Sequence, residues 1–193
     1  MKITTIYLLA FLVSGSLFAQ SDIVTVNGDF ETPSEFKVWN GENGTAWSAN
    51  GYKLWAKADK SQLFDAENSG VVAGEGVDES GALKLVVKKG DNPFDFMITF
   101  DDVKISEPGT YTISFKVKSQ NLEKVPFWLV AKNDKKEDVG TGSAKNWKGM
   151  NEEWKEQTLS ITTSEKDEKV ALSFGLAKAD NTYWFDDMKV VSN

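Results

Sequence analysis

The sequence contains no cysteine, no histidine and no arginine among its 193 residues. Without cysteine the chain can form no disulfide bond and use no thiol nucleophile, so a buried core, with or without a metal ion, has to hold the fold. Without histidine, histidine-dependent catalytic triads and imidazole-ligated zinc are excluded. Carboxylates are the groups left for catalysis, and no particular pair stands out among 29 acidic residues.

The missing arginine also restricts the partners. All 22 basic residues are lysines, and the formal net charge is −7. Nucleic-acid and phosphate sites favour the forked donors of arginine and a positive surface. Anionic lipid surfaces likewise attract basic segments. After residue 19 no apolar run is long enough to span a bilayer. The sequence therefore predicts no nucleic-acid partner and no membrane insertion.

The first residues have the pattern of a secretory signal peptide. An apolar run from Ile6 to Val13 follows a short positive start, small residues stand at 14–16, and Ala19 offers a cleavage site. The alternative, an N-terminal membrane anchor, has less support because the run is too short to span. We expect a signal peptide at 1–19, one domain at 20–193, and a secreted protein in the periplasm, at the cell surface or outside the cell.

Most of the remaining chain alternates apolar and polar residues with a period of two, which is typical of half-buried strands. The clearest examples are 94–100, 111–117 and 170–176. No segment reads as a helix of ten or more residues. Roughly ten short strands separated by turn signals predict an all-β fold, an antiparallel β-sandwich of the jelly-roll type.

The two ends carry acidic motifs. In 24–31, alternation places Asn27, Asp29 and Glu31 on one face, which makes a plausible half-site for a hard cation. At the other end Trp184, Asp186, Met188 and Val190 share a face, so Asp186 would point toward the core and need a partner. First and last strands of a sandwich often lie side by side. The functional interpretation is a structural Ca²⁺ site, and the alternative, favoured by spacing alone, is turn chemistry with Asp186 paired to lysine or exposed.

Five segments together resemble one family. They are Asn27-Gly28-Asp29-Phe30-Glu31, Trp47 (preceded by Ala46 where the family has glycine), Gly109 to Phe115, Trp154 followed by Leu159 and Ile161, and Tyr183 to Val190. In order and spacing they resemble carbohydrate-binding modules of the family 4/9/22 type, which have a galactose-binding-like jelly roll. The resemblance implies carbohydrate binding and a Ca²⁺ near the two ends, held by Glu31 and Asp186, with Asp29 and Asp187 as secondary candidates.

The tryptophans supply the candidate sugar platform. An indole ring can pack against the apolar face of a pyranose while nearby polar groups bind its hydroxyls. Alternation leaves Trp128 opposite the core-facing Phe127 and Leu129, and Trp147 lies in a polar segment that we expect to be a loop. The predicted ligand-binding residues are Tyr52, Trp55, Trp128 and Trp147, with Asn50 and Lys53 as polar partners. For any single tryptophan, core packing is the competing interpretation.

These observations favour a secreted, non-catalytic protein that binds a neutral polysaccharide or oligosaccharide by aromatic stacking and hydroxyl hydrogen bonds. The resemblance also suggests a separately encoded glycoside hydrolase as a partner. Two alternatives remain. One is a structural or adhesion β-sandwich without sugar affinity, which scattered or buried aromatic residues would favour. The other is a small jelly-roll glycoside hydrolase, which would need two carboxyl groups across a groove.

Overall fold

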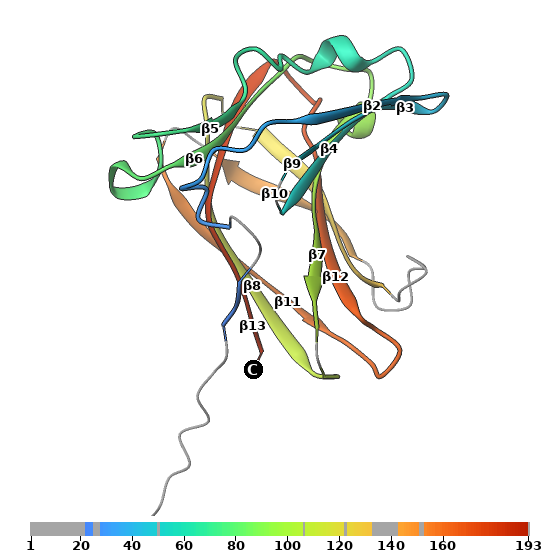
Figure 1. The fold of residues 1–193 in the computed structure, drawn as a ribbon, viewed down its shortest axis with the longest axis vertical. Coiled ribbons are helices and arrows are strands. Elements are labelled where there is room, and N and C mark those ends of the chain that lie inside the picture. The colour runs from blue at the N-terminus through green and yellow to red at the C-terminus, as the bar shows by residue number, and fades with distance from the viewer. Residues whose placement is uncertain are drawn as a thin grey trace, which may run out of the picture.

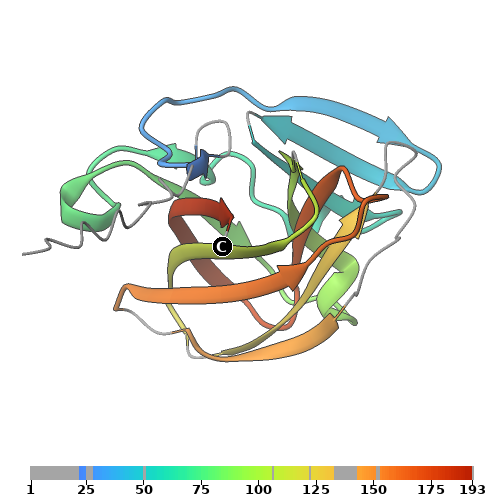
Figure 2. The same cartoon turned by 90° about the horizontal axis from the view of Figure 1, so that it is seen from below.

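The computed structural model describes residues 22–24, 28–49, 51–105, 107–121, 123–132, 143–150 and 153–192. These residues form two antiparallel sheets that face each other across a buried layer (Figures 1 and 2). The signal peptide predicted at 1–19 lies outside the described residues. Within the described part of the chain, no helix is long and apolar enough to cross a membrane.

The six-stranded sheet has the order β11-β8-β13-β6-β5, and β1 pairs with one end of β13. Its strands are β1 (Asp22–Val24), β5 (Gly70–Val72), β6 (Ala82–Val87), β8 (Thr110–Ser119), β11 (Lys155–Thr162) and β13 (Asn181–Ser192). The pairing of β1 with β13 confirms that the first and last strands are neighbours.

The seven-stranded sheet has the order β10-β9-β12-β7-β4-β3-β2. Its strands are β2 (Lys37–Gly41), β3 (Gly44–Ala49), β4 (Tyr52–Lys57), β7 (Phe96–Lys104), β9 (Glu123–Lys132), β10 (Ser143–Met150) and β12 (Lys169–Gly175). From β6 onward the chain changes sheet at every connection except that between β9 and β10. These crossings confirm the expected all-β sandwich. The short 3₁₀ helices are η1 (Ser61–Leu63), η2 (Val77–Glu79) and η3 (Pro93–Asp95).

Phenylalanine rings from both sheets fill the layer between them. The Phe174 ring of β12 lies 5.5 Å from the Phe185 ring of β13 and 5.6 Å from the Phe115 ring of β8, centroid to centroid. The Phe100 ring of β7 is 5.5 Å from the Phe185 ring. Rings at these spacings bury large apolar areas and gain from edge-to-face contacts. This cluster therefore joins the two sheets.

A bulge in β13 changes which residues face the core. Tyr183 and Phe185 point inward before the bulge, and Met188 and Val190 point inward after it. The register shifts between Asp186 and Lys189, and Asp187 has a positive φ of 51°. A bulge inserts one extra residue and so reverses the alternation beyond it. The prediction that Trp184 and Asp186 share the inner face of Met188 and Val190 is therefore wrong. Asp186 is buried, but it pairs with the outward Lys116 and is covered by segment 77–81 instead of pointing into the core.

Replacing Phe174 should show how much the fold depends on the ring layer. Its side chain is fully buried and contacts rings from both sheets. We expect Phe174→Ala to lower the free energy of unfolding by about 3–5 kcal/mol, because it leaves a cavity where few atoms can move in. Urea unfolding measures this, with the exposed Thr158→Ala as control. A loss below about 1 kcal/mol would contradict a central role for this ring.

Candidate functional site

The outer face of the seven-stranded sheet carries the strongest candidate site. In β4, Tyr52, Leu54 and Ala56 are buried in the core, so the strand period of two turns Lys53 and Trp55 to the outer face. Trp55 is partly exposed there. The hairpins that join β2, β3 and β4 place this part of the sheet at its free edge, drawn in blue and teal in Figures 1 and 2.

An apolar row crosses this outer face from strand to strand. The register pairs Trp39 with Ala46, Ala46 with Trp55, Trp55 with Met97, and Met97 with Gly175. Trp39 is 62% exposed and Val38 is 57% exposed, and among the described residues these two are the large apolar side chains classed as exposed. Trp39 and Trp55 lie two strands apart, which corresponds to roughly 10 Å. Together these residues form an apolar row that carries two indole groups.

Two glycines leave room for aromatic rings to lie against the sheet. A side chain at Gly41 would overlap the ring of Trp39, and a side chain at Gly175 would press on the ring of Phe94. Each ring therefore occupies the space that a Cβ atom would need. This packing holds the rings close to the backbone of the sheet, and it limits the freedom of Trp39 despite its exposure.

A second row, next to the first, is polar. The register links Lys37, Ser48, Lys53, Thr99, Ser173 and Trp128 in that order. The hydroxyl groups of Thr99 and Ser173 lie 2.9 Å apart and share a hydrogen bond. Ammonium and hydroxyl groups thus lie two residues along each strand from the apolar row, on the same face. Ligand sites commonly combine apolar and aromatic side chains with a few polar groups, as these two rows do.

The structure corrects the prediction for Tyr52. Its ring is 1% exposed and packs against Phe30 and Phe36, with centroids 6.0 and 6.2 Å away. Burial raises the pKa of the Tyr52 hydroxyl to about 12. Residues three apart in a strand face opposite sides, so Tyr52 and Trp55 lie on different faces of β4. Tyr52 is a core residue and does not belong to the candidate site.

The other predicted ligand-binding residues differ in what the structure describes. Trp128 lies in β9 and pairs with Ser173, in the register of the polar row, but its side chain lies outside the description. Trp147 belongs to strand β10, paired with Val125, so the expectation of a loop there is wrong. Asn50 lies outside the described residues. The part these three residues play in binding stays a prediction.

Sequence reasoning did not select Trp39. The Asn-Gly pair at 40–41 reads as a turn, whereas it forms the end of β2. The strand also lacks an apolar–polar alternation, because it is an exposed edge strand. The local composition could have predicted the exposure of Trp39, because its neighbours Lys37, Asn40 and Gly41 offer few apolar groups to bury an indole ring.

The acidic motifs at the two ends approach the same segment, 77–81. The Oε1 atom of Glu31 accepts a hydrogen bond from the backbone N–H of Gly81 at 3.0 Å. The Oδ2 atom of Asp186 accepts from the Val77 N–H at 2.8 Å and from the Ser80 hydroxyl at 3.0 Å. Asp29 is exposed, and its carboxylate accepts only a long hydrogen bond, 3.4 Å, from the Glu31 N–H among the described contacts.

Asp186 is a strongly buried carboxyl group, 1% exposed. Burial raises its pKa, although hydrogen bonds from Val77, Asp187 and Ser80 oppose the shift. No group of three or more acidic side chains among the described residues is arranged to hold a metal ion. A calcium site here would therefore combine Glu31 and Asp186 with backbone carbonyl groups, the hard oxygen donors that Ca²⁺ accepts.

Known structures share this architecture. One described as "CBM4 structure and function" superposes with a TM-score of 0.59 at 19% identity, over 88% of this chain and 100% of that one. The CBM22-1 xylan-binding domain of Paenibacillus barcinonensis Xyn10C gives a TM-score of 0.54 at 12% identity, over 89% and 94% of the two chains. The CBM22-1–GH10 modules of Clostridium thermocellum Xyn10B, complexed with xylohexaose, give 0.55 at 13% identity, over 90% and 29%.

This chain has the jelly-roll fold of the CBM4 and CBM22 carbohydrate-binding modules. The resemblance to modules of the 4/9/22 type, predicted from the end motifs and the strands between them, is confirmed at the level of the fold. No protein-family model and no curated protein sequence matches the chain. The fold is thus established by structure, at identities of 19% or below for these three neighbours.

The packing of Trp39 over Gly41 can be tested directly. We expect Gly41→Ala to displace the indole ring and to shift the Trp39 indole N–H signal in NMR spectra, because the new methyl group occupies the space of the ring. The free energy of unfolding should change by less than about 1 kcal/mol, since the displaced group is an exposed side chain. In a Trp39→Ala background, Gly41→Ala should have no further effect on ligand binding. Additive effects of the two changes would contradict the packing.

Proposed function

We propose that this protein is a non-catalytic carbohydrate-binding protein that holds a neutral polysaccharide or oligosaccharide on the outer face of the seven-stranded sheet. The observation that carries the proposal is the row of Trp39 and Trp55 beside a polar row on the same face. Exposed indole rings lose solvent contact when they bind an apolar surface, which stabilises the complex. The faces of sugar rings offer such a surface.

The polar row provides hydrogen-bonding groups for the sugar hydroxyls. Lys53 and Thr99 are paired across β4 and β7, two residues along each strand from the Trp55–Met97 pair. A sugar ring stacked on Trp55 would bring its hydroxyl groups to the edge of this row. The spacing of roughly 10 Å between Trp39 and Trp55 favours a ligand of several sugar units over a single monosaccharide.

The structural neighbours favour the same ligand class. The Paenibacillus module is a xylan-binding domain, and the Clostridium enzyme was solved with xylohexaose. In that enzyme the module is joined to a GH10 module. We accordingly propose a β-linked plant polysaccharide such as xylan as the first ligand to test, and a glycoside hydrolase as a functional partner.

The composition of the candidate face favours binding over hydrolysis. A glycosidase needs two carboxyl groups on either side of the scissile bond. The apolar and polar rows, from Lys37 to Gly175, contain no aspartate or glutamate. A ligand lying along these rows would meet aromatic, hydroxyl and ammonium groups, which can bind it but supply no carboxyl acid.

Affinity electrophoresis against soluble xylan, β-glucan, mannan and pectin tests the proposal. We expect one neutral polymer to retard the protein, and Trp39→Ala or Trp55→Ala to weaken this binding about tenfold or more, because each removes an aromatic stacking surface. Val38→Ala is the matched control, since Val38 is also exposed on β2 but lies on the other side of that strand. The absence of retardation by every polymer would contradict carbohydrate binding.

We further propose that Glu31 and Asp186 bind a structural Ca²⁺ ion that ties the first strand segment to the last. Their convergence on segment 77–81 supports this proposal. Met188, just after Asp186, donates a backbone hydrogen bond to the Gly28 carbonyl at 2.8 Å, so the two segments are already adjacent. Asp29 remains a weaker candidate ligand because, among the described contacts, its carboxylate accepts only from the Glu31 N–H and does not reach segment 77–81.

Chelation should then lower the melting temperature. At a Ca²⁺ concentration 100 times its Kd, binding adds about 2.7 kcal/mol, which corresponds to roughly 5–10 °C for a domain of this size. Calorimetry with and without EDTA measures the difference, and Glu31→Gln should reduce it. Equal melting temperatures in both conditions, with no metal detected in the purified protein, would refute the calcium site.

We also propose that the protein is secreted. The apolar run at 6–13 and the small residues before Gln20 support removal of residues 1–19 during export. N-terminal sequencing of protein recovered from outside the cytoplasm should start at Gln20. A protein that binds extracellular polysaccharide has to be exported, so the two parts of the proposal agree.

A further inference from the structure

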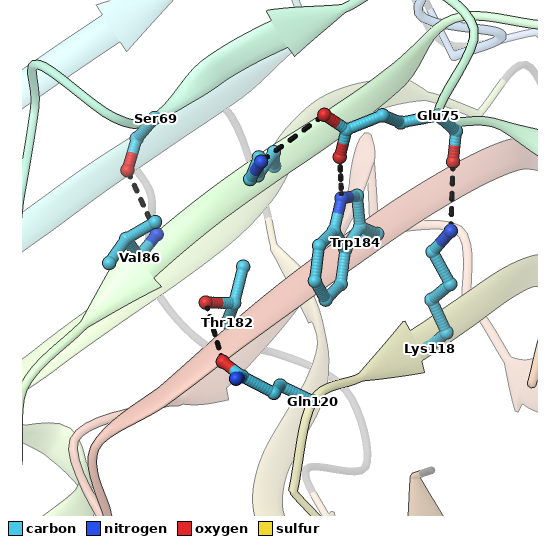
Figure 3. A network of polar contacts seen from close by, with 8 residues as sticks. Ser69, Glu75, Val86, Lys118, Gln120, Thr182 and Trp184 are labelled. Atoms are coloured by element: carbon cyan, nitrogen blue, oxygen red, sulfur yellow. Dashed lines mark hydrogen bonds and ion pairs between the residues drawn. The ribbon is translucent and has the colours of Figure 1, made fainter. Parts of the chain in front are cut away.

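The outer face of the six-stranded sheet, on the other side of the sandwich, contains a pocket of about 400 Å³. It is lined by Lys84, Lys118, Ser119, Gln120, Thr182 and Trp184. These residues come from the neighbouring strands β6, β13 and β8, and from Gln120 just after the end of β8. Figure 3 shows the polar contacts around the Trp184 indole. The pocket does not overlap the two rows of the candidate site, because those rows belong to the other sheet.

Trp184 lies at the centre of a cross-strand row between two lysines. The register pairs Trp184 with Lys84 of β6 on one side and with Lys118 of β8 on the other. The ammonium nitrogen of Lys84 is 5.6 Å from the centroid of the indole ring, and that of Lys118 is 5.1 Å away. Lys118 also lies 4.7 Å from the ring centroid of Trp154. Both ammonium groups are thus within the range of cation–π attraction to Trp184.

Glu75 fixes this arrangement from the loop before η2. Its two carboxylate oxygens accept hydrogen bonds from the Trp184 indole N–H at 2.6 Å and from Lys84 at 3.2 Å. Its backbone carbonyl accepts from Lys118 at 3.0 Å (Figure 3). Burial opposes ionisation of Glu75, but the hydrogen bonds from Trp184 and Lys84 outweigh it and lower the pKa of the carboxyl group. The indole ring and both ammonium groups are therefore held in place before any ligand binds.

The charge of the pocket contrasts with that of the whole protein. The chain has a net charge of −7, and the six residues that line the pocket include two lysines and no carboxylate. Glu75, just outside the lining, forms an ion pair with Lys84 at 3.2 Å, so two lysines and one carboxylate leave the cluster with a formal net charge of +1. The neighbouring Lys116 is paired with Asp187 at 2.8 Å and so adds little net charge. Each ammonium group has three N–H donors, and Glu75 engages one from each lysine. A local positive pocket on an acidic protein attracts a compact anion and repels a long polyanion.

The remaining lining groups suit a sugar. Thr182 donates its hydroxyl hydrogen to the Oε1 atom of Gln120 at 3.3 Å (Figure 3). This bond occupies the accepting oxygen of Gln120 and orients its amide NH₂ group, which is a donor suited to a hydroxyl oxygen. The pocket thus offers a flat indole, two ammonium groups and an amide in one place. A ring with an apolar face, a carboxylate and several hydroxyl groups would engage all of them.

We propose that this pocket is a second saccharide site, specific for a sugar unit that carries a carboxylate, such as a uronic acid. The carboxylate would bind between Lys84 and Lys118, the sugar ring would pack on Trp184, and its hydroxyl groups would reach Gln120 and Thr182. A single uronate, or one that occurs as a branch on a neutral chain, fits the size and the local charge better than a polyuronate. The site does not depend on the function proposed for the other sheet.

Titration of the mature protein with sodium D-glucuronate, followed by the indole N–H signals in NMR spectra, tests the proposal. Trp184→Phe identifies the Trp184 signal by its loss. We expect glucuronate to shift this signal in a saturable way, while D-glucose and acetate, which lack the carboxylate and the sugar ring respectively, cause at most one fifth of the shift at equal concentration. Lys84→Met and Lys118→Met should each weaken the apparent affinity about fivefold or more, as expected for a charge-assisted hydrogen bond in a partly exposed pocket.

Two controls separate the possible outcomes. Lys166→Met removes the same charge from an exposed turn outside the pocket and should leave the response unchanged. Trp39→Ala should also leave it unchanged, even though it removes binding on the other sheet, so failure of one site is distinguishable from failure of the other. An equal response to glucose or to acetate, or an undiminished response in both pocket lysine variants with intact folded spectra, would overturn the proposal.

Discussion

With no disulfide bond available, this protein depends on the layer of phenylalanine rings between its two sheets. Phe100 and Phe174 of one sheet contact Phe115 and Phe185 of the other. Strands β7, β8, β12 and β13 supply these rings from segments far apart in the sequence, so the layer forms only when the chain has crossed between the sheets several times. The ring layer therefore cannot form without the crossings between the sheets, and the crossings are stabilised by the ring layer. The strands that carry both outer faces are held in place by this layer.

Successive side chains in a strand point to opposite faces, so the residues next to the core residues in sequence form the two outer faces of the sandwich. Each inward ring leaves its neighbours in sequence on the outside. In β4 the burial of Leu54 turns Trp55 outward, and in β13 the burial of Phe185 turns Trp184 outward. The two indole groups therefore project from opposite sides of the sandwich. Which tryptophan can meet a ligand is decided by its neighbours in the strand, because they set the direction of its side chain.

The alternation of side chains along a strand also explains which features could be predicted from the sequence and which could not. Alternation predicts the strands at 94–100, 111–117 and 170–176, because both faces of these segments are distinct. Alternation also places Tyr52 on the face of Leu54 and Ala56, which is the buried face, so the prediction of Tyr52 as a ligand-binding residue was wrong. Trp39 was missed for a different reason: β2 is an edge strand whose inward residue, Val38, is itself exposed, so the strand has no alternation to read.

Local backbone geometry limits the prediction at the two ends. The even spacing of Asp186 with Met188 and Val190 predicted its burial, but the bulge breaks that spacing, and segment 77–81 buries the carboxyl group instead. The bulge at Asp187 could not be predicted, since it depends on a register shift against β8 and on hydrogen bonds to the distant segment 77–81. That segment shows no strand pattern. It meets Asp186 only because β6 lies beside β13, and this contact is a property of the sheet order.

The two outer faces differ in the chemistry that the sheets present, and this difference has a consequence for binding. Packed sheets lie about 10 Å apart, so a ligand on one face cannot touch a ligand on the other. Under the two proposals, the row beside Trp55 would bind a neutral chain of sugars, and the lysines beside Trp184 would bind a single anionic unit. A protein with both faces could hold a neutral polysaccharide and an acidic branch of a second chain at the same time.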